Sequence, residues 1–181
     1  KLLYVGRLIV QKGVVEFIQL ANELSDSVSD LEFIVVGEAE EHPDAVDPAW
    51  LSKQCSITLL GFQDQEKLKS LLMEADIFVF PSYYREGVPR VVLEAAATGL
   101  PVVGFDAPGV KEGIVNGETG YLVGIRDLEA LTAKTKILVN DTDLRLRLGR
   151  NGRRFIEEKF RIESIHEQYE KVYRRLGVTL N

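Results

Sequence analysis

Two glutamates, Glu86 and Glu94, lie eight positions apart in the segment Y-Y-R-E-G-V-P-R-V-V-L-E-A. Glu94 falls on a predicted helix, Pro89–Thr98, where Arg90, Glu94 and Thr98 share a narrow polar stripe on an otherwise apolar surface. A helix that is apolar on most sides is packed between neighbours, so we expect its polar stripe to face a cleft. Carboxylates suit sugar and ribose hydroxyls, because each oxygen accepts two hydrogen bonds. The ordinary alternative is a solvated stripe with an i,i+4 ion pair between Arg90 and Glu94.

The start of the same helix has no evident capping side chain. Pro89 suits the first helical position, which places the cap on Val88, a residue that cannot accept a hydrogen bond. Gly87 allows a ligand to approach the backbone closely. The N–H groups of Arg90 and Val91 then lack a local partner, and a diphosphate could supply one.

A second candidate site lies in the loop G-R-L-I-V-Q-K-G at the start of the chain. Arg7 and Lys12 bracket the turn before a predicted helix. Cations near an empty helix N-terminus are unfavourable, so their presence predicts an anion site. The alternative is two ordinary surface charges. The loop matches neither the Walker A pattern nor the dinucleotide-binding G-x-G-x-x-G pattern, which disfavours nucleotide hydrolysis and nicotinamide chemistry.

These residues must be positioned by alternating strands and helices. The predicted strands are Leu2–Val5, Glu32–Val36, Ile57–Leu60, Ile77–Phe80, Pro101–Phe105 and Tyr121–Val123. The predicted helices are Lys12–Ser25, Asp47–Gln54, Asp64–Ala75, Pro89–Thr98, a short one at Val110–Val115, Leu128–Val139, Asp143–Glu158 and Ile162–Leu176. Continuously apolar strands joined by helices predict an α/β, Rossmann-like three-layer sandwich with a parallel sheet of about six strands. Ligands of such sheets bind outside the carboxyl ends of the strands.

Composition narrows the class of protein. The 181 residues suit a single domain over residues 1–181, and the net charge of −6 without a basic stripe argues against a nucleic-acid partner. The single cysteine, Cys55, allows no disulfide within the chain, favours a reducing compartment, and is expected to be inert. We expect no signal peptide and no membrane span. The chain starts on Lys1 and opens directly on a strand, so we expect a fragment of a longer protein.

In these motifs the sequence resembles the C-terminal domain of GT-B-fold retaining glycosyltransferases of family four, the group-one glycosyl transferases. The resemblance rests on G-R-L…K-G, on E-G-V-P-R-V-V-L-E-A, on A-T-G-L-P-V-V and on P-G-V-K-E-G-I-V-N-G-E-T-G-Y-L-V, and it covers essentially the whole chain. The form S-Y-Y-R-E-G-V-P-R is similar to bacterial enzymes that build surface polysaccharides.

The resemblance implies a donor site with catalytic roles for Arg7, Lys12 and Glu86. Arg7 and Lys12 would bind the diphosphate of a UDP- or GDP-type donor sugar, and Glu86 would contact the sugar near its reacting carbon. The ribose hydroxyls would be held by Glu94. The remaining donor contacts would come from the backbone of Gly87, Val88, Pro89 and Arg90, and from the base-binding loops at Gly37 and at Gly61 and Phe62.

The resemblance also implies partners and a location. The family uses no essential metal, and no cofactor is expected. The acceptor, a sugar or a lipid-linked glycan, would bind an N-terminal domain that is absent from this chain, so we expect the fragment to bind nucleotide weakly and to be inactive alone. The protein is expected in the cytoplasm, with any membrane contact at the inner face through the missing domain. The other readings are a non-catalytic nucleotide-sugar-binding module and a related GT-B enzyme, such as an epimerase or a phosphorylase.

Four further features of the sequence bear on these expectations. The segment G-E-A-E-E-H-P-D, Gly37–Asp44, is longer and more acidic than the short turn common in the family, and its side chains are expected to point away from a diphosphate. Val110 and Lys111 stand where the surface-polysaccharide subgroup often has Cys and Arg. D-T-D at Asp141–Asp143 matches a metal-binding D-x-D pattern, but helix capping explains it better. The C-terminal apolar series, most of which is expected to pack within the domain, comprises Phe155, Phe160, Ile165, Tyr169, Val172, Tyr173 and Leu176.

Overall fold

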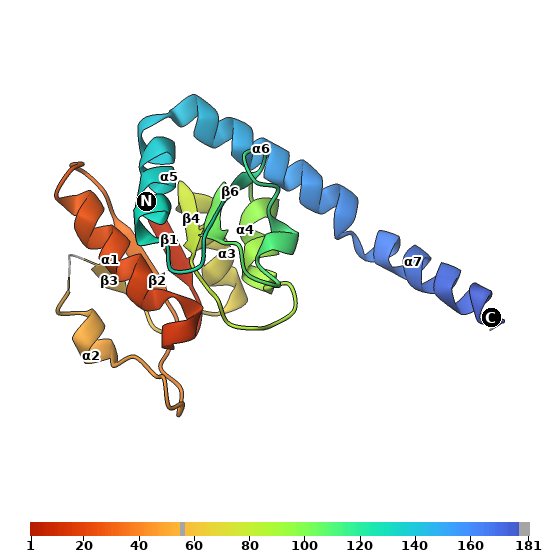
Figure 1. Cartoon of the computed structure of the whole chain (residues 1–181), viewed down its shortest axis with the longest axis horizontal. Helices are drawn as coiled ribbons and strands as arrows, with labels where there is room; N and C mark the ends of the chain where they lie inside the picture. Colours follow the sequence, from red (N-terminus) through yellow and green to blue (C-terminus); the bar gives the residue numbers. More distant parts are fainter. Residues whose placement is uncertain (55–56, 178–181) are drawn as a thin grey trace.

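The fold is a parallel six-stranded sheet covered by helices, as seen in a computed structural model that describes residues 1–54 and 57–177 (Figure 1). Cys55 lies outside the described residues. The strand order is β3-β2-β1-β4-β5-β6, and every pairing is parallel. The order in which successive strands are added to the sheet reverses between β1 and β4. Doubly wound sheets bind their ligands at such a switch point.

The elements have the following bounds. The strands are β1 Leu2–Val5, β2 Phe33–Val36, β3 Ile57–Leu59, β4 Ile77–Phe80, β5 Val102–Phe105 and β6 Gly120–Val123. The α-helices are α1 Val14–Ser25, α2 Pro48–Leu51, α3 Gln65–Glu74, α4 Arg90–Ala97, α5 Leu128–Asn140, α6 Thr142–Lys159 and α7 Ile162–Arg175. Two 3₁₀ turns, η1 Val10–Lys12 and η2 Lys111–Gly113, lie in the loops after β1 and β5.

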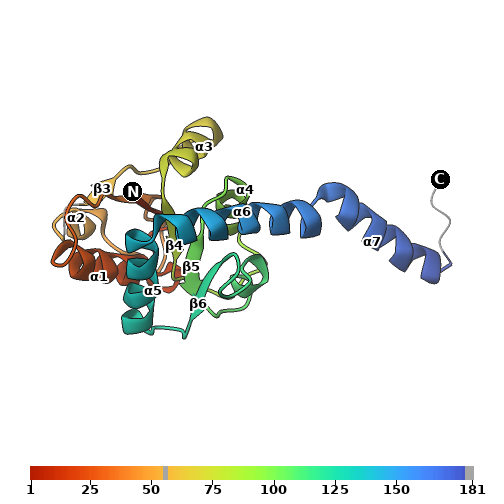
Figure 2. The same cartoon turned by 90° about the horizontal axis from the view of Figure 1, so that it is seen from above.

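The central strands are buried on both faces. All residues of β4 and of β5 are buried, and the neighbouring strands add to the same core. Helices α1 and α5 pack together on one face of the sheet, whereas α4 packs with α6 on the other side, where α3 also lies (Figure 2). The predicted Rossmann-like α/β sandwich with a parallel sheet is therefore confirmed.

The helix predicted from Lys12 is in fact divided at a glycine. Lys12 ends the 3₁₀ turn η1, Gly13 adopts φ +82°, and α1 begins at Val14. A Cβ atom on Gly13 would lie 2.1 Å from the carbonyl oxygen of Pro81, so a side chain here is excluded by contact as well as by backbone conformation. The division places Lys12 in a tight turn at the carboxyl end of β1 rather than along a helix.

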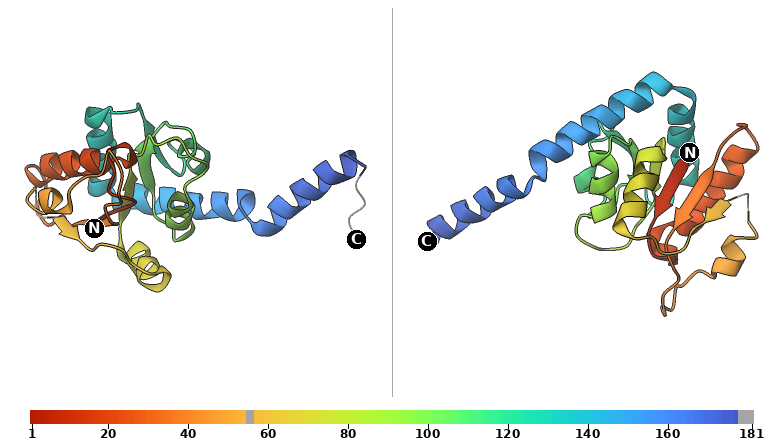
Figure 3. Two further views of the ribbon diagram at one scale, coloured as in Figure 1. Left: turned by 90° about the horizontal axis from the view of Figure 1, so that it is seen from below. Right: turned by 180° about the vertical axis from the view of Figure 1, so that it is seen from behind.

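The C-terminal helix differs from the prediction. Phe155 and Phe160 pack against the core as expected. Helix α7, however, extends away from the rest of the chain (Figure 3), and its Tyr169 and Leu176 side chains are 61% and 72% exposed. Val172 and Tyr173 are exposed as well, and the side chain of Ile165 lies outside what the structure describes. The prediction of intradomain packing is therefore wrong for the described apolar residues of α7, because the helix points away from the core that the described residues form.

Within the described residues, none of the helices combines the length and the apolar character needed to cross a bilayer.

Candidate donor-binding site

The candidate site lies at the carboxyl ends of β1, β2, β3 and β4. A cavity of about 330 Å³ opens there, and its lining includes Gly6, Arg7, Gly37, Glu40 and Phe62. The three loops after β1, β2 and β3 are joined by backbone hydrogen bonds: Gly6 donates to Val36, and Gly37 donates to Gly61. The predicted site loops therefore meet, as expected for the carboxyl edge of a parallel sheet.

Arg7 faces this cavity from the loop after β1. Its Nη1 donates to Oε2 of Glu40 at 3.1 Å, and its guanidinium lies 5.3 Å from the ring centroid of Tyr84. The hydrogen bond to Glu40 raises the pKa of Arg7, and the neighbouring Tyr84 adds to this effect. Arg7 is therefore a charged and partly exposed donor at the mouth of the cavity.

Lys12 is the second predicted cation, and it is buried. Only 7% of the residue is exposed, and its ammonium forms an ion pair with Glu86. The Nζ atom lies 5.0 Å from the centroid of the Tyr84 ring. Lys12 and Glu86 come from loops far apart in sequence, so the tertiary structure joins two of the three predicted catalytic residues directly.

A buried tyrosine holds the loop that carries both cations. The hydroxyl of Tyr4, which is fully buried in β1, donates to the carbonyl oxygens of Lys12 at 3.2 Å and of Arg7 at 3.3 Å. Burial, reinforced by the negative charge of Glu16 and Glu86, raises the pKa of Tyr4 far above its ordinary range. Tyr4 therefore remains a neutral hydrogen-bond donor beneath the loop.

The loop that carries Glu86 and Gly87 is supported by the loop after β5. A Cβ atom on Gly109 would lie 2.5 Å from the carbonyl oxygen of Gly87 and 2.7 Å from that of Glu86. The N–H of Gly109 donates to Oε2 of Glu112 at 2.6 Å, which fixes the close turn. The segment P-G-V-K-E thus positions the Glu86 loop by backbone contact.

Helix α4 begins one residue later than predicted. Pro89 is the N-cap, with φ −64° and ψ 123°, so the prediction of Val88 as the cap is wrong. The physical consequence is the same, because proline also offers no capping side chain. The carbonyl of Pro89 accepts from Val92 and Leu93. Among the hydrogen bonds of the described residues, none engages the N–H of Arg90 or Val91, and both remain available to an anion.

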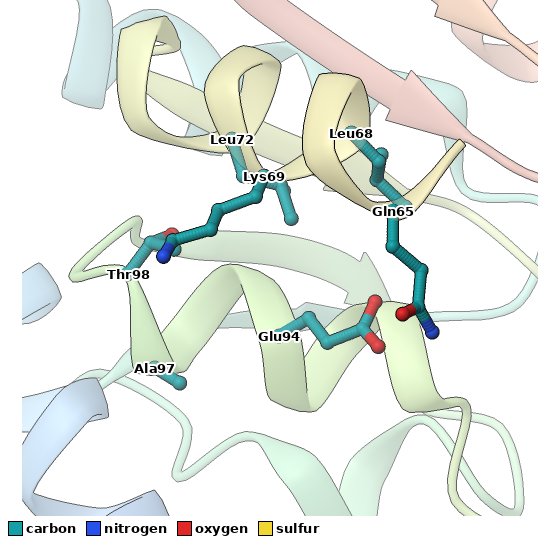
Figure 4. Close-up of a pocket in the computed structure, with 7 residues that line it drawn as sticks. All are labelled: Gln65, Leu68, Lys69, Leu72, Glu94, Ala97 and Thr98. Atoms are coloured by element: carbon teal, nitrogen blue, oxygen red, sulfur yellow. The ribbon is translucent and has the colours of Figure 1, made fainter. Parts of the chain in front are cut away.

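Glu94 lies in a groove between α4 and α3. Figure 4 shows its carboxylate projecting from α4 into the space that faces α3, with Gln65 pointing toward the same end. The groove encloses about 360 Å³ and adjoins the first cavity, since Leu68 lines both. The i,i+4 ion pair between Arg90 and Glu94 is also present, with Nη2 of Arg90 3.8 Å from Oε1 of Glu94. Both groups are exposed, so this pair leaves the carboxylate accessible.

Phe62 stands at the rim of the first cavity with 71% of the residue exposed. It follows Gly61, whose φ of +65° ends β3 and turns the chain toward α3. An exposed aromatic ring beside a cavity can stack on a planar group. This position agrees with the base-binding role that the resemblance implies.

The acidic segment after β2 corrects one prediction. The sequence predicts that its side chains point away from the anion site, but Glu40 forms an ion pair with Arg7. The physical reason is that the guanidinium has no other carboxylate within reach in the described chain, and the loop passes beside it. Glu40 and Tyr84 were therefore not among the predicted site residues, although the Tyr84 ring lies beside both cations. The signal for Tyr84 was its position two residues before Glu86.

The D-x-D segment has a structural role. Asp141 is the N-cap of α6, and its Oδ1 accepts from the N–H of Leu144 at 2.9 Å. Asp64 caps α3 in the same way. Over residues 1–54 and 57–177, no group of three or more His, Cys, Asp and Glu side chains is placed to hold a metal ion.

The known proteins that this chain resembles are glycosyltransferases. Residues 1–155 match the family model for glycosyl transferases group 1. The chain is 34% identical to the capsular polysaccharide biosynthesis glycosyltransferase CapM of Staphylococcus aureus over 172 residues, which cover 94% of this chain and 44% of CapM. The chain spans about half the length of the curated relatives that it matches.

Two solved structures are informative. The C-terminal domain of a glycosyl transferase group 1 family protein, LpcC from Francisella tularensis, is 30% identical with a TM-score of 0.76, and the match covers 89% of this chain and 86% of that domain. Anabaena HepE in complex with UDP has the same fold at a TM-score of 0.83 and 23% identity, over 96% of this chain and 48% of HepE. With the site geometry and the family match in agreement, this chain belongs to the glycosyl transferases group 1 family and forms one Rossmann-like domain of a GT-B fold.

Proposed function

We propose that this chain is the donor-binding domain of a metal-independent, retaining glycosyltransferase that transfers a sugar from a nucleotide-diphosphate sugar to an acceptor hydroxyl. The observation that carries the proposal is the meeting of Arg7, the Lys12–Glu86 pair and the uncapped start of α4 at one edge of the sheet. This arrangement offers two fixed cations and free N–H groups to an anion.

The chemistry requires stabilisation of a leaving diphosphate. The bond from the anomeric carbon to the diphosphate oxygen breaks, and a bond from that carbon to the acceptor oxygen forms, while the acceptor proton leaves to the diphosphate or to solvent. Arg7, Lys12 and the α4 N-terminus would stabilise the negative charge that develops on the leaving group. Glu86 would hold Lys12 in place and contact the donor sugar. The carboxylate of Glu86 would also stabilise positive charge at the anomeric carbon.

The nucleoside would extend from the diphosphate toward α3. In this arrangement Glu94 accepts hydrogen bonds from the ribose hydroxyls in the groove between α3 and α4. The base lies against the Gly37 and Gly61 loops, with Phe62 at its edge. The backbone from Gly87 to Arg90 covers the sugar and phosphates.

The whole protein is proposed to carry an N-terminal domain that binds the acceptor. The match to about half of each relative supports this division, and the LpcC domain shows that a C-terminal unit of this size occurs in the family. The name of CapM supports a role in bacterial polysaccharide biosynthesis. We further propose that the whole protein is a hexosyltransferase that acts on the cytoplasmic side in polysaccharide or glycolipid biosynthesis. A UDP-type donor agrees with the UDP complex of HepE.

Calorimetric titration with UDP, GDP, ADP and their sugars tests the proposal on the wild type and on Glu94→Ala. We expect one of the diphosphates to bind at micromolar to millimolar concentration, and Glu94→Ala to weaken that nucleotide by about tenfold or more, because hydrogen bonds to a carboxylate are strong. Glu66→Gln, an exposed residue of α3 outside the groove, is the control. The absence of binding by every nucleotide at millimolar concentration would contradict a donor site in this chain.

A further inference from the structure

The acidic loop, Gly37–Asp44, is fastened to the loop that carries Arg7. The N–H of Leu8 donates to the carbonyl of Glu38 at 2.9 Å, and the N–H of Val10 donates to that of Asp44 at 2.9 Å. A side-chain bond from Gln11 to Asp44 at 3.0 Å adds to these contacts. Both ends of the acidic loop are therefore fixed beside Arg7, and its tip, which includes Glu40, protrudes into solvent.

This attachment presents one carboxylate to the guanidinium of Arg7. Nη1 of Arg7 lies 3.1 Å from Oε2 of Glu40, and both residues line the cavity at the strand ends. The two side chains are 37% and 51% exposed. The Lys12–Glu86 pair differs, since its side chains are only 9% and 25% exposed. Of these two pairs, the one at Arg7 is the more accessible to solvent and to an incoming anion.

We propose that Glu40 is an internal competitor for the diphosphate, which holds Arg7 when the donor is absent and must be displaced when the donor binds. The inference rests on the proposed function of Arg7 as a diphosphate ligand. Glu40 thereby becomes a residue that sets the affinity for nucleotide and that selects ligands carrying enough charge to displace a carboxylate.

The energetics favour exchange rather than a permanent block. An exposed ion pair contributes little to stability, because water solvates both partners well and salt screens them. A diphosphate carries more charge than one carboxylate and can contact Lys12 and the α4 N-terminus at the same time, so it wins the competition. Removal of the Glu40 charge is therefore expected to tighten binding, because Arg7 is no longer held by a competing carboxylate.

The test uses the 181-residue chain, UDP as the probe, and calorimetry at physiological salt. Glu40→Gln keeps the size of the side chain and is expected to tighten UDP binding by roughly three- to tenfold. Glu41→Gln is the matched control, because it removes the same charge from the next residue of the exposed loop. Glu41 has no ion pair among those that the structure describes. We expect the control to change the affinity by less than about twofold.

A double-mutant cycle separates competition at Arg7 from a general charge effect. In the Arg7→Gln background, Glu40→Gln should give less than about twofold tightening, because the guanidinium for which both anions compete is gone. Glu40→Gln should increase the affinity for UMP less than the affinity for UDP, because UMP carries less negative charge to interact with Arg7.

Three results would overturn the inference while the proposed function survives. UDP could bind Glu40→Gln no better than wild type, the Glu41→Gln control could tighten binding equally, or the gain could persist in the Arg7→Gln background. The absence of UDP, GDP and ADP binding in every variant would instead remove the proposed function, and this inference with it. Circular dichroism confirms that each variant is folded before titration.

Discussion

Each cation at the site has a carboxylate partner, and the two pairs differ in their surroundings. Lys12 and Glu86 meet within the protein, so breaking this pair would leave a charge poorly solvated. Arg7 and Glu40 meet at the surface, where separation costs little. The buried pair therefore acts as a fixed part of the site, and the exposed pair as the exchangeable part.

A third carboxylate, Glu16, has a different role in the same region. It lies in the first turn of α1 with 8% of the residue exposed, and its buried Oε2 has no hydrogen-bond partner among the residues that the structure describes. Burial raises the pKa of Glu16, while its backbone hydrogen bond and the positive charge of Arg126 oppose the shift. Arg126 itself donates from Nη2 to the hydroxyl of Tyr83 at 3.0 Å. The charge of Glu16 is thus a cost to the folded state at neutral pH.

We predict that Glu16→Gln stabilises the chain at neutral pH. Because the folded pKa lies above the unfolded one, the native state binds more protons than the unfolded state in the window from the ordinary value of 4.5 upward. Stability of the wild type therefore falls as pH rises through this window, and the glutamine variant avoids that loss. In urea denaturation, the wild type and the Glu16→Gln variant should have equal free energies of unfolding at pH 4. At pH 7.5 the variant should have the larger free energy of unfolding.

The control for this prediction is Glu23→Gln, an exposed glutamate on the same helix. Its removal should change the free energy of unfolding at pH 7.5 little, because an exposed side chain is solvated in the folded and the unfolded state. A Glu16→Gln variant that is less stable than wild type at pH 7.5 would show that the carboxylate of Glu16 is stabilising.

At the scale of elements, tight turns at the strand ends determine where the charged groups lie. The 3₁₀ turn η1 and Gly13 bring Lys12 back over the edge of the sheet, and Gly109 places the loop after β5 against Glu86. The hydroxyl of Tyr4 anchors η1 from below. Backbone geometry therefore positions the site as much as the charged residues do.

We predict that Gly13→Ala is far more destabilising than Gly99→Ala. Both glycines have positive φ, +82° and +87°, so each substitution incurs a conformational cost of about 1–2 kcal/mol. Only at Gly13 would the added Cβ meet the backbone, 2.1 Å from the carbonyl oxygen of Pro81, whereas nothing lies within 4 Å at Gly99. We expect a total loss above about 3 kcal/mol for Gly13→Ala in urea denaturation. Equal losses in the two variants would show that the turn at Gly13 relaxes.

At the scale of the whole molecule, α7 is the element least integrated into the fold. It extends beyond the layers of the domain with Ile162, Tyr169, Val172 and Leu176 exposed. An apolar helix face that is exposed in the described chain is available for contact with another surface. We propose that this surface belongs to the N-terminal domain proposed above for the whole protein.

Truncation after Arg161 tests how independent α7 is. We predict a change in Tm below about 2 °C, because the described side chains of α7 bury little apolar surface against the core. Truncation after Asp141 is the contrasting variant, since it removes Leu148 and Ile156 of α6 from the core and should lower Tm strongly. A large loss of Tm on removing α7 alone would contradict its position in the structure.

The 181-residue chain is predicted to bind nucleotide without catalysing transfer. A donor site alone cannot position an acceptor hydroxyl or exclude water, and both are needed for transfer. Release of nucleotide from UDP- and GDP-sugars should stay at background in the presence of candidate glycan acceptors. Robust turnover by the purified chain would show that it contains a complete active site.

Much of this molecule follows from its sequence alone. Apolar strands that alternate with helices determine the parallel sheet, since a sheet buried on both faces needs such strands. The types and spacing of Arg7, Lys12, Glu86 and Glu94 indicate an anion and sugar site, because ligands bind at the carboxyl ends of parallel strands. Asp64 and Asp141 are recognisable as helix caps for a local reason, namely that their side chains reach N–H groups three residues away.

Only the tertiary structure decides which of these groups meet. The Lys12–Glu86 pair joins residues 74 positions apart, and the Arg7–Glu40 pair joins residues 33 positions apart. Periodicity and local spacing carry no information about contacts at that separation, because the packing of loops from different strands creates them. The exposure of α7 has the same origin: its sequence is amphipathic, but whether its apolar face meets a core depends on where the helix points.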